Sequence, residues 1–236
     1  MTTIDFAGIK VDNVTIDEAV AKAQAFLASG RPHLIVTPNP EMIVAAQADE
    51  ELRAIINAAD LRVPDGISLV VVSKILGRPL KERVAGIDLM TRLCGLKARV
   101  FLLGSGEGVA LEAARQLTGK NPGLQVVGTQ DGYFSDDSGV VKKIQSARPD
   151  IIFVGLGAGR QERWLNRHLP ELGVKIGLAV GGSLDVLSGR KKRAPKWIQA
   201  LYIEWLYRLL TEPQRWQRQL ALPKFLWLMF FARNKN

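Results

Sequence analysis

Residues 1–189 alternate between short apolar runs and longer segments with the spacing of amphipathic helices. Continuous apolar runs, which are typical of strands buried on both faces, occur at 33–37, 99–105, 124–134, 150–157 and 175–182. Helical segments of about ten residues separate the last four runs. This alternation predicts an α/β fold, in which a Rossmann-like, mostly parallel sheet carries helices on both faces.

Local signals place the helices. The predicted helices cover 15–28, 50–59, 67–76, 108–117, 138–147 and 161–172. Thr15-Ile-Asp-Glu18 opens the first of them as a capping box. Pro40 suits the first turn of a further helix, which follows the strand at 33–37. The apolar segment 67–76 is expected to be mostly buried and to end at Gly77.

Glycine follows several of the predicted strands. The glycines at the strand ends are Gly104, Gly132, Gly155, Gly157, Gly181 and Gly182. Ligands of open α/β sheets bind beyond the carboxyl ends of the strands, so these loops are expected to surround the ligand site. Gly104-Ser-Gly-Glu-Gly108 is either a phosphate-binding loop or a simple tight turn. Because Val109 stands where the dinucleotide fingerprint needs its third glycine, the sequence disfavours a nicotinamide-dependent dehydrogenase.

The composition changes at Ser188. Residues 188–236 hold 11 of the 32 Lys and Arg but only two of the 23 acidic residues, so the whole net charge of +9 lies there. Four of the five tryptophans lie there as well, and an almost purely apolar run extends from Leu220 to Ala232. We therefore expect a neutral Rossmann-like catalytic body at 1–189 and a basic, aromatic, helical appendage at 190–236.

Asp65 is a candidate general base. It lies in Pro64-Asp65-Gly66, at the expected carboxyl end of a short strand, where a partly buried carboxylate suits proton abstraction. The alternative is a turn or a helix cap. Thr37 and Asn39 follow the strand at 33–37 and could reach the same pocket with hydrogen bonds suited to sugar hydroxyls. For them, too, a helix N-cap is the alternative.

Other chemistries find less support. His33 and His168 lie far apart in the sequence and no Asp-x-Asp pair is present, so we expect no metal and no cofactor. Cys94, the single cysteine, is expected to be a buried thiol in a reducing compartment. The serine-hydrolase pattern G-x-S-x-G is missing. We expect no secretory leader and no membrane-spanning segment, since no apolar run reaches about 18 residues.

The order and spacing of several motifs carry a family resemblance over nearly the whole chain. The motifs are Thr37-Pro-Asn39-Pro-Glu41, Pro64-Asp65-Gly66, Arg83-Val-Ala-Gly86, Arg160-Gln161-Glu162, Gly181-Gly-Ser-Leu-Asp185-Val-Leu-Ser-Gly189, Arg193-Ala-Pro-Lys-Trp197, Glu204-Trp-Leu-Tyr-Arg208 and Glu212-Pro-Gln-Arg215-Trp-Gln-Arg218. With them the chain resembles the WecG/TagA/CpsF family of glycosyltransferases. Arg160 stands where the family more often has Lys, and Leu184 where it often has Phe. These departures bear on the sugar specificity more than on the reaction.

The resemblance implies a metal-independent, inverting glycosyltransferase. It would move a sugar, most often N-acetylmannosamine, from a UDP-sugar to N-acetylglucosamine on undecaprenyl diphosphate, as in the linkage unit of wall teichoic acid. Other members transfer N-acetylmannosaminuronic acid, or glucose in exopolysaccharide synthesis. The alternative from another class is a non-catalytic module that binds a nucleotide or a nucleic acid.

The resemblance also implies roles for individual residues. Asp65 would deprotonate the acceptor hydroxyl, and Arg83 would contact the diphosphate. Thr37, Asn39 and Gln161 would line the site of the sugar and the acceptor. The further candidate substrate-binding residues are Gly104, Gly132, Tyr133, Gly182 and Asp185 on the body, and Arg208, Arg215 and Arg218, expected at the lipid diphosphate, on the appendage.

The appendage fits a membrane surface better than a nucleic acid. It combines cations and interfacial aromatic residues with an apolar run of about 13 residues, which is too short to span a bilayer. We expect Phe225, Trp227, Phe230 and Phe231 to insert together with their leucine neighbours, and the protein to be peripheral on the cytoplasmic face of the cell membrane. A nucleic-acid site leaves the apolar run unexplained. Packing on the body, or on a partner subunit in a homo-oligomer, is the third interpretation.

Overall fold

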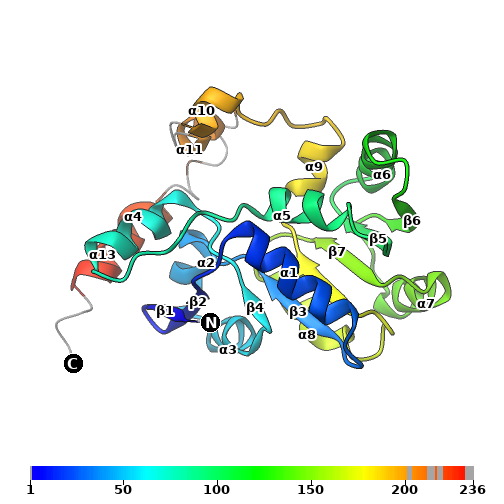
Figure 1. The fold of residues 1–236 in the computed structure, drawn as a ribbon, viewed down its shortest axis with the longest axis horizontal. Helices are drawn as coiled ribbons and strands as arrows, with labels where there is room; N and C mark the ends of the chain where they lie inside the picture. Colours follow the sequence, from blue (N-terminus) through cyan, green and yellow to red (C-terminus); the bar gives the residue numbers. More distant parts are fainter. Residues whose placement is uncertain (1, 201–203, 212–215, 217–219, 232–236) are drawn as a thin grey trace.

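A six-stranded, wholly parallel sheet forms the centre of the protein (Figure 1). The computed structural model describes residues 2–200, 204–211, 216 and 220–231. The strand order is β4-β3-β8-β7-β5-β6, and the strands are β3 (His33–Val36), β4 (Leu61–Arg62), β5 (Arg99–Gly104), β6 (Gln125–Gln130), β7 (Ile151–Gly155) and β8 (Ile176–Ala179). The predicted α/β fold class is confirmed.

Two buried clusters cover the two faces of the sheet, because side chains alternate along each strand. On β5, Phe101 and Leu103 join one cluster, whereas Val100 and Leu102 join the other. The helices that pack with Val100 and Leu102 are α1 (Ile16–Leu27), α5 (Gly86–Leu93), α6 (Val109–Lys120) and α9 (Ser183–Leu187). The elements that pack with Phe101 and Leu103 are β1 (Thr3–Phe6), β2 (Ile9–Asp12), α2 (Pro40–Ala45), α3 (Glu50–Ala58), α4 (Ile67–Ile75), α7 (Asp137–Ala147) and α8 (Arg160–His168).

The helix signals in the sequence place most helix starts correctly. The backbone N–H of Glu18 donates to Thr15 Oγ1 and that of Thr15 to Glu18 Oε2, which confirms the capping box of α1. The expectation for α4 needs correction, because Val71 and Ile75 on this apolar helix are exposed. The antiparallel β1–β2 hairpin, α5 and α9 were not predicted.

The sheet has a crevice where its connections diverge. The chain leaves β5 through α6 on one face and leaves the adjacent β7 through α8 on the opposite face. Such a switch point opens a space beyond the carboxyl ends of the strands, where ligands of α/β sheets bind. The fold therefore confirms the predicted location of the glycine-rich loops around this space.

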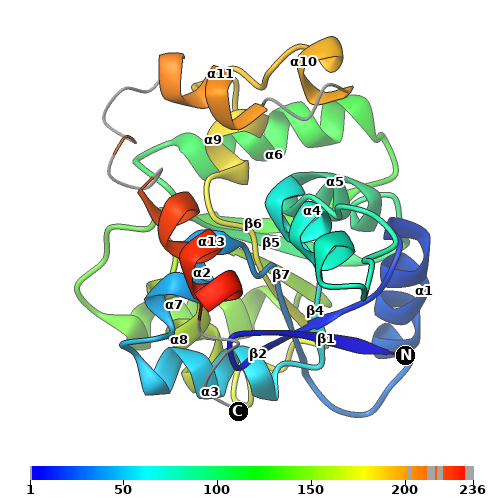
Figure 2. The same cartoon turned by 90° about the vertical axis from the view of Figure 1, so that its left-hand side faces the viewer.

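The appendage contains three described helices, α10 (Lys196–Ala200), α11 (Glu204–Thr211) and α13 (Ala221–Phe231). Helix α13 contacts α2 and α4, and Figure 2 shows α10 and α11 apart from it, above α9 and α6. Phe225 is fully buried, with its ring 6.2 Å from that of Phe6. The expectation that Phe225 inserts into a membrane is therefore wrong: it anchors α13 to the body. None of the described helices combines the length and the apolar character needed to cross a bilayer.

Candidate active site

A cavity of about 700 Å³ lies at the carboxyl ends of the strands. The predicted site residues that line it are Thr37, Asn39, Asp65, Arg83, Gly132, Tyr133, Gln161, Gly182 and Asp185. Gly104 is not among the lining residues, although its neighbour Ser105 is. Arg208 belongs to α11, and the placement of its side chain is outside what the structure describes, as are Arg215 and Arg218 altogether. The fold thus brings residues from six separate segments of the body to one space.

Glycines let three strand ends approach closely at the centre of the cavity. A Cβ on Gly104 would lie 2.3 Å from the carbonyl oxygen of Gly155, and a Cβ on Gly155 would lie 2.6 Å from that of Gly181. Both distances are far inside van der Waals contact, so only glycine fits. The backbone N–H of Ser105 donates to the Gly155 oxygen at 2.9 Å across this contact. The wall at β5, β7 and β8 is therefore bare backbone, against which a flat or anionic group could lie.

The loop Gly104–Gly108 is built as a turn. Of its residues, all of which the structure describes, Ser105 lines the cavity, and its hydroxyl donates to Asp185 Oδ2 at 3.2 Å. Arg190 donates to the carbonyl oxygen of Glu107 at 2.6 Å and covers the outer part of the loop. The tight-turn alternative therefore describes most of this loop, and Ser105 is its contribution to the cavity.

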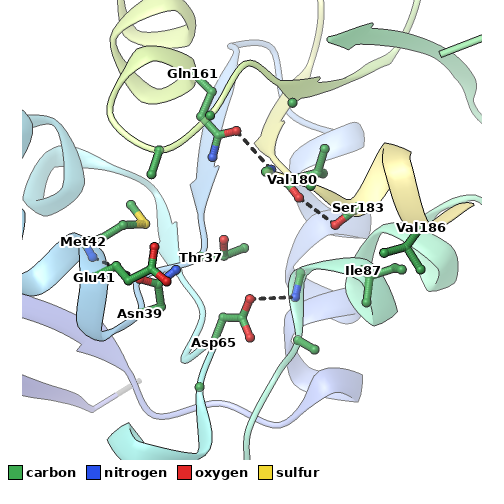
Figure 3. A pocket seen from close by; sticks show the side chains of 18 of the residues that line it. Thr37, Asn39, Glu41, Met42, Asp65, Ile87, Gln161, Val180, Ser183 and Val186 are labelled. Carbon is green, nitrogen blue, oxygen red and sulfur yellow. Dashed lines mark hydrogen bonds between the residues drawn. The ribbon is translucent and has the colours of Figure 1, made fainter. Parts of the chain in front are cut away.

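Asp65 points into the cavity from the end of β4 (Figure 3). Its backbone N–H donates to the carbonyl oxygen of Pro38 at 3.0 Å, which ties the ends of β4 and β3 together. Gly66, with φ of 136°, begins α4 without a side-chain cap. Asp65 Oδ2 instead accepts a long hydrogen bond of 3.5 Å from the N–H of Gly86, at the start of α5. Gly66, not Asp65, is thus the N-cap of α4, and the Asp65 carboxylate is 28% exposed.

Thr37 and Asn39 stand next to Asp65 (Figure 3). Asn39 is the N-cap of α2, since its Oδ1 accepts from the N–H of Met42 at 3.0 Å. The capping interpretation of Asn39 is therefore confirmed, although its side chain lines the cavity as well. Thr37 is buried, and its hydroxyl donates to the Ala179 oxygen at 3.5 Å. Figure 3 shows Thr37, Asp65 and Glu41 around the same opening.

Gln161 forms part of the wall through a buried network. Its Nε2 donates to Glu162 Oε1 at 2.7 Å, and its Oε1 accepts from the N–H of Gly181 at 3.0 Å. The other carboxylate oxygen of Glu162 accepts from the N–H of Gly159 at 2.6 Å. Burial raises the pKa of Glu162 above its ordinary value of 4.5, against the opposing effect of these hydrogen bonds. Gln161 therefore fixes the loop after β8.

Two ion pairs join the appendage to the rim of the cavity. Arg193 forms a bidentate pair with Asp88 on α5, at 2.6 and 2.7 Å. The Asp88 carboxylate, together with the more distant Glu204 and Asp65, raises the pKa of Arg193. Arg83, which lines the cavity, donates to Glu204 on α11. Arg193 and Glu204, both beyond the predicted boundary at 189, are thus held to α5 and to the cavity wall.

Five charged cavity residues were not named as site candidates from the sequence. They are Glu41, Arg160, Lys191, Lys192 and Glu204. The basic run at 190–193 was a signal for the two lysines, and the family motifs include Glu41 and Arg160 without assigning either a role. Together with Arg83, these cations could hold a diphosphate. Glu41 places a second carboxylate beside Asp65.

Metal and thiol chemistry find no site in the part of the chain that the structure describes. No group of three or more His, Cys, Asp or Glu side chains there could hold a metal ion. That the reaction needs no metal stays a prediction. Cys94 is buried, as predicted, and burial raises its pKa to about 12. A thiol with such a pKa is inert as a nucleophile.

Comparisons with known proteins identify the family of the chain. The model of the glycosyl transferase WecG/TagA/CpsF family matches residues 4–236. A protein of Bacillus spizizenii named N-acetylglucosaminyldiphosphoundecaprenol N-acetyl-beta-D-mannosaminyltransferase is 41% identical over 85% of this chain and 80% of its own length. A protein of Staphylococcus aureus with the same name is 35% identical over 98% of this chain and 94% of its own. The chain is therefore a glycosyltransferase and belongs to the WecG/TagA/CpsF family.

Proposed function

We propose that the protein transfers N-acetylmannosamine from a UDP-sugar to N-acetylglucosamine linked to undecaprenyl diphosphate, with inversion and without a metal. The names of the relatives contain both this acceptor and this transferred sugar, which supports the proposal. The observation that carries the proposal is the position of Asp65. It is a partly exposed carboxylate in the cavity, with cationic side chains on the same walls. A base and a diphosphate clamp are the two things that displacement at an anomeric carbon needs.

The chemistry assigns a role to each wall. Asp65 takes the proton of the acceptor hydroxyl as that oxygen attacks the anomeric carbon on the face opposite the departing UDP. Negative charge then grows on the diphosphate, and the cations that line the cavity stabilise it. Inversion follows from this single displacement.

The two substrates fit opposite ends of the cavity. The end at β5, β7 and β8 has bare glycine backbone together with Ser105, Tyr133 and Asp185, which suits a nucleotide. The end at β3 and β4 is walled by α2, α4 and α13 and is more apolar, which suits a lipid-linked acceptor. Asp65 and Thr37 follow β4 and β3 themselves, so the acceptor hydroxyl would meet the base at this end of the cavity.

We also propose that residues 190–236 form an appendage that holds the body, residues 1–189, on the cytoplasmic face of the cell membrane. Trp227 and Phe231 support this proposal, because their rings stack 6.1 Å apart while both side chains are 63% exposed. Exposed aromatic residues beside cations are typical of interfacial helices. Each Lys or Arg near an anionic leaflet contributes about 1 kcal/mol. A homo-oligomer stays an open prediction.

A panel of UDP-sugars tests the reaction. Release of UDP is measured with one lipid-diphosphate N-acetylglucosamine acceptor, with and without a chelator. We expect turnover with UDP-N-acetylmannosamine and no effect of the chelator. If only the UDP-linked mannosaminuronic acid or glucose donor supports turnover, that sugar takes the place of N-acetylmannosamine in the proposed reaction. Absence of UDP release with every donor would favour a non-catalytic binding module.

Vesicle flotation tests the membrane proposal. The paired change Trp227→Ser and Phe231→Ser should weaken flotation on anionic vesicles. Leu111→Ser on α6, which also removes an exposed apolar side chain, should float like the unchanged protein. Equal flotation of all three proteins would exclude α13 as the membrane contact.

A further inference from the structure

An apolar surface leads out of the cavity along two neighbouring helices. Ile67 and Ser68 on the first turn of α4 line the cavity, and so do Leu222 and Leu226 on α13. The two helices contact each other, and Figures 1 and 2 both place them at the same end of the molecule. Both helices therefore border the cavity, and we call the surface along their contact, which begins at the cavity, the groove.

On α4, the face that lines the cavity continues outward as exposed apolar residues. Val71 is four residues after Ile67, and Ile75 is four residues further, so the three side chains share one helix face. Val71 is 49% and Ile75 is 61% exposed. The opposite face of α4, with Leu69 fully buried, supplies the packing on the core. Packing of the body therefore does not explain why Val71 and Ile75 are apolar.

On α13, a second apolar row begins in the cavity. Leu222, Leu226 and Phe230 are spaced by four residues on one face, and Phe230 is 40% exposed. Phe225 and Met229 on the neighbouring face fix the helix to the body. The eight residue steps from Leu222 to Phe230 span about 12 Å along the helix axis, which is roughly the length of two or three isoprene units.

We propose that the groove between α4 and α13 binds the first isoprene units of the lipid-linked acceptor. The inference rests on the proposed function, because it assigns the groove to that acceptor. Its argument is continuity: the same helix faces that line the acceptor end of the cavity run on to the surface as apolar residues. If the cavity cations hold the diphosphate of the acceptor, the lipid chain attached to it begins where the groove begins. Val71 and Ile75 thus become contacts for the lipid chain.

Short acceptors in solution, without vesicles or detergent, test the groove. KM is compared for N-acetylglucosaminyl diphosphates that carry one or three isoprene units. We expect the unchanged protein to prefer three units by about tenfold, since two further units bury apolar area in the groove. The paired change Val71→Ser and Ile75→Ser should reduce this preference to about twofold and leave KM for the one-unit acceptor unchanged. Leu111→Ser, on the opposite side of the molecule, should keep the tenfold preference.

A binding measurement separates failure of the groove from failure of the proposed function. Calorimetric titration with farnesyl diphosphate needs no turnover and should show weaker binding to the paired variant. If sugar is transferred but the chain length has no effect, the groove is excluded and the function stands. If no sugar is transferred but farnesyl diphosphate binding depends on Val71 and Ile75, the function fails and the groove stands. A paired variant that loses vesicle flotation but keeps the tenfold preference would assign this face to the bilayer and overturn the proposal.

Discussion

Arg83 and Glu204 join the cavity to the appendage through a largely buried ion pair. Both Nη atoms of Arg83 donate to Glu204 Oε2 at 3.1 Å, and the Glu204 side chain is only 6% exposed. Nε of the same guanidinium lies 3.6 Å from Asp65 Oδ1. One arginine thus faces both the candidate base and a helix of the appendage. The position of α11 is thereby linked to the electrostatics of the reaction centre.

Removal of the Glu204 carboxylate should loosen α11 without unfolding the body. Glu204→Ala leaves the Arg83 cation without this buried partner, a loss that typically costs about 3–5 kcal/mol. We expect faster hydrogen exchange in residues 204–211 and unchanged exchange in β5 and β7. Glu107→Ala, which removes an exposed carboxylate, is the control. Unchanged exchange in α11 would show that other contacts hold this helix.

Asp65→Asn should abolish most of the turnover while preserving the site. The amide keeps the size of the side chain and an oxygen that can accept from Gly86, but it cannot take a proton. We expect kcat to fall by about 10²–10⁴ and KM for the UDP-sugar to stay within about threefold. Glu41→Gln, at another carboxylate of the cavity, should have a much smaller effect. A larger loss of kcat from Glu41→Gln than from Asp65→Asn would assign the role of the base to Glu41 instead of Asp65.

A methyl group at Gly155 should damage the nucleotide end of the cavity. The added Cβ meets the Gly181 carbonyl oxygen at 2.6 Å, so the loop after β8 must move. We expect Gly155→Ala to cost about 1–3 kcal/mol of stability and to weaken UDP binding, as measured by denaturant unfolding and calorimetry. Gly119→Ala is the matched control, because it lies in α6 with open space around it and should stabilise by up to about 1 kcal/mol.

The sequence predicted the parts of the fold that local pattern determines. The five apolar runs correspond to β3, β5, β6, β7 and β8, and the capping box starts α1. The N-terminal hairpin was missed because buried and exposed residues mix within its two short strands, so it lacks the continuous apolar run that marks β3 and β8. Helix α5 was missed because it begins at Gly86 without a side-chain cap, so no local signal marks its start. Its position depends on the tertiary contacts of Leu89, Met90 and Leu93, which sequence pattern does not reveal.

The site was predictable where motifs mark strand ends and less so where the appendage contributes. Asp65, Thr37 and Asn39 follow β4 and β3, and parallel strands bring their carboxyl ends to one edge. Glu204 carried no such signal, because its partner Arg83 lies 121 positions away. Hydrophobicity alone could not separate Phe225, which anchors α13 in the core, from the exposed Trp227. Both are apolar residues of the same helix, and only the packing distinguishes them.

Glu162 should make stability depend on pH. Burial raises the pKa of its carboxyl in the folded protein above the ordinary 4.5, so the unfolded chain loses this proton at lower pH than the folded protein does. The folded state therefore binds more protons between these two values, and stability falls as pH rises through this window. Glu162→Gln lacks this component, and it also loses one of the two acceptors for Gly159 and Gln161, at a cost of about 1–3 kcal/mol.

Urea unfolding between pH 4.5 and pH 8 measures this dependence. The stability difference between the unchanged protein and Glu162→Gln should be largest at the acid end and should shrink toward neutral pH, because only the carboxyl becomes charged inside the protein. Groups common to both proteins cancel in this difference. Glu107→Gln, at an exposed glutamate, should differ from the unchanged protein by a nearly constant amount. A difference for Glu162→Gln that stays flat, or that grows with pH, would contradict the raised pKa and show that the wall of the cavity readily holds an ionised carboxylate.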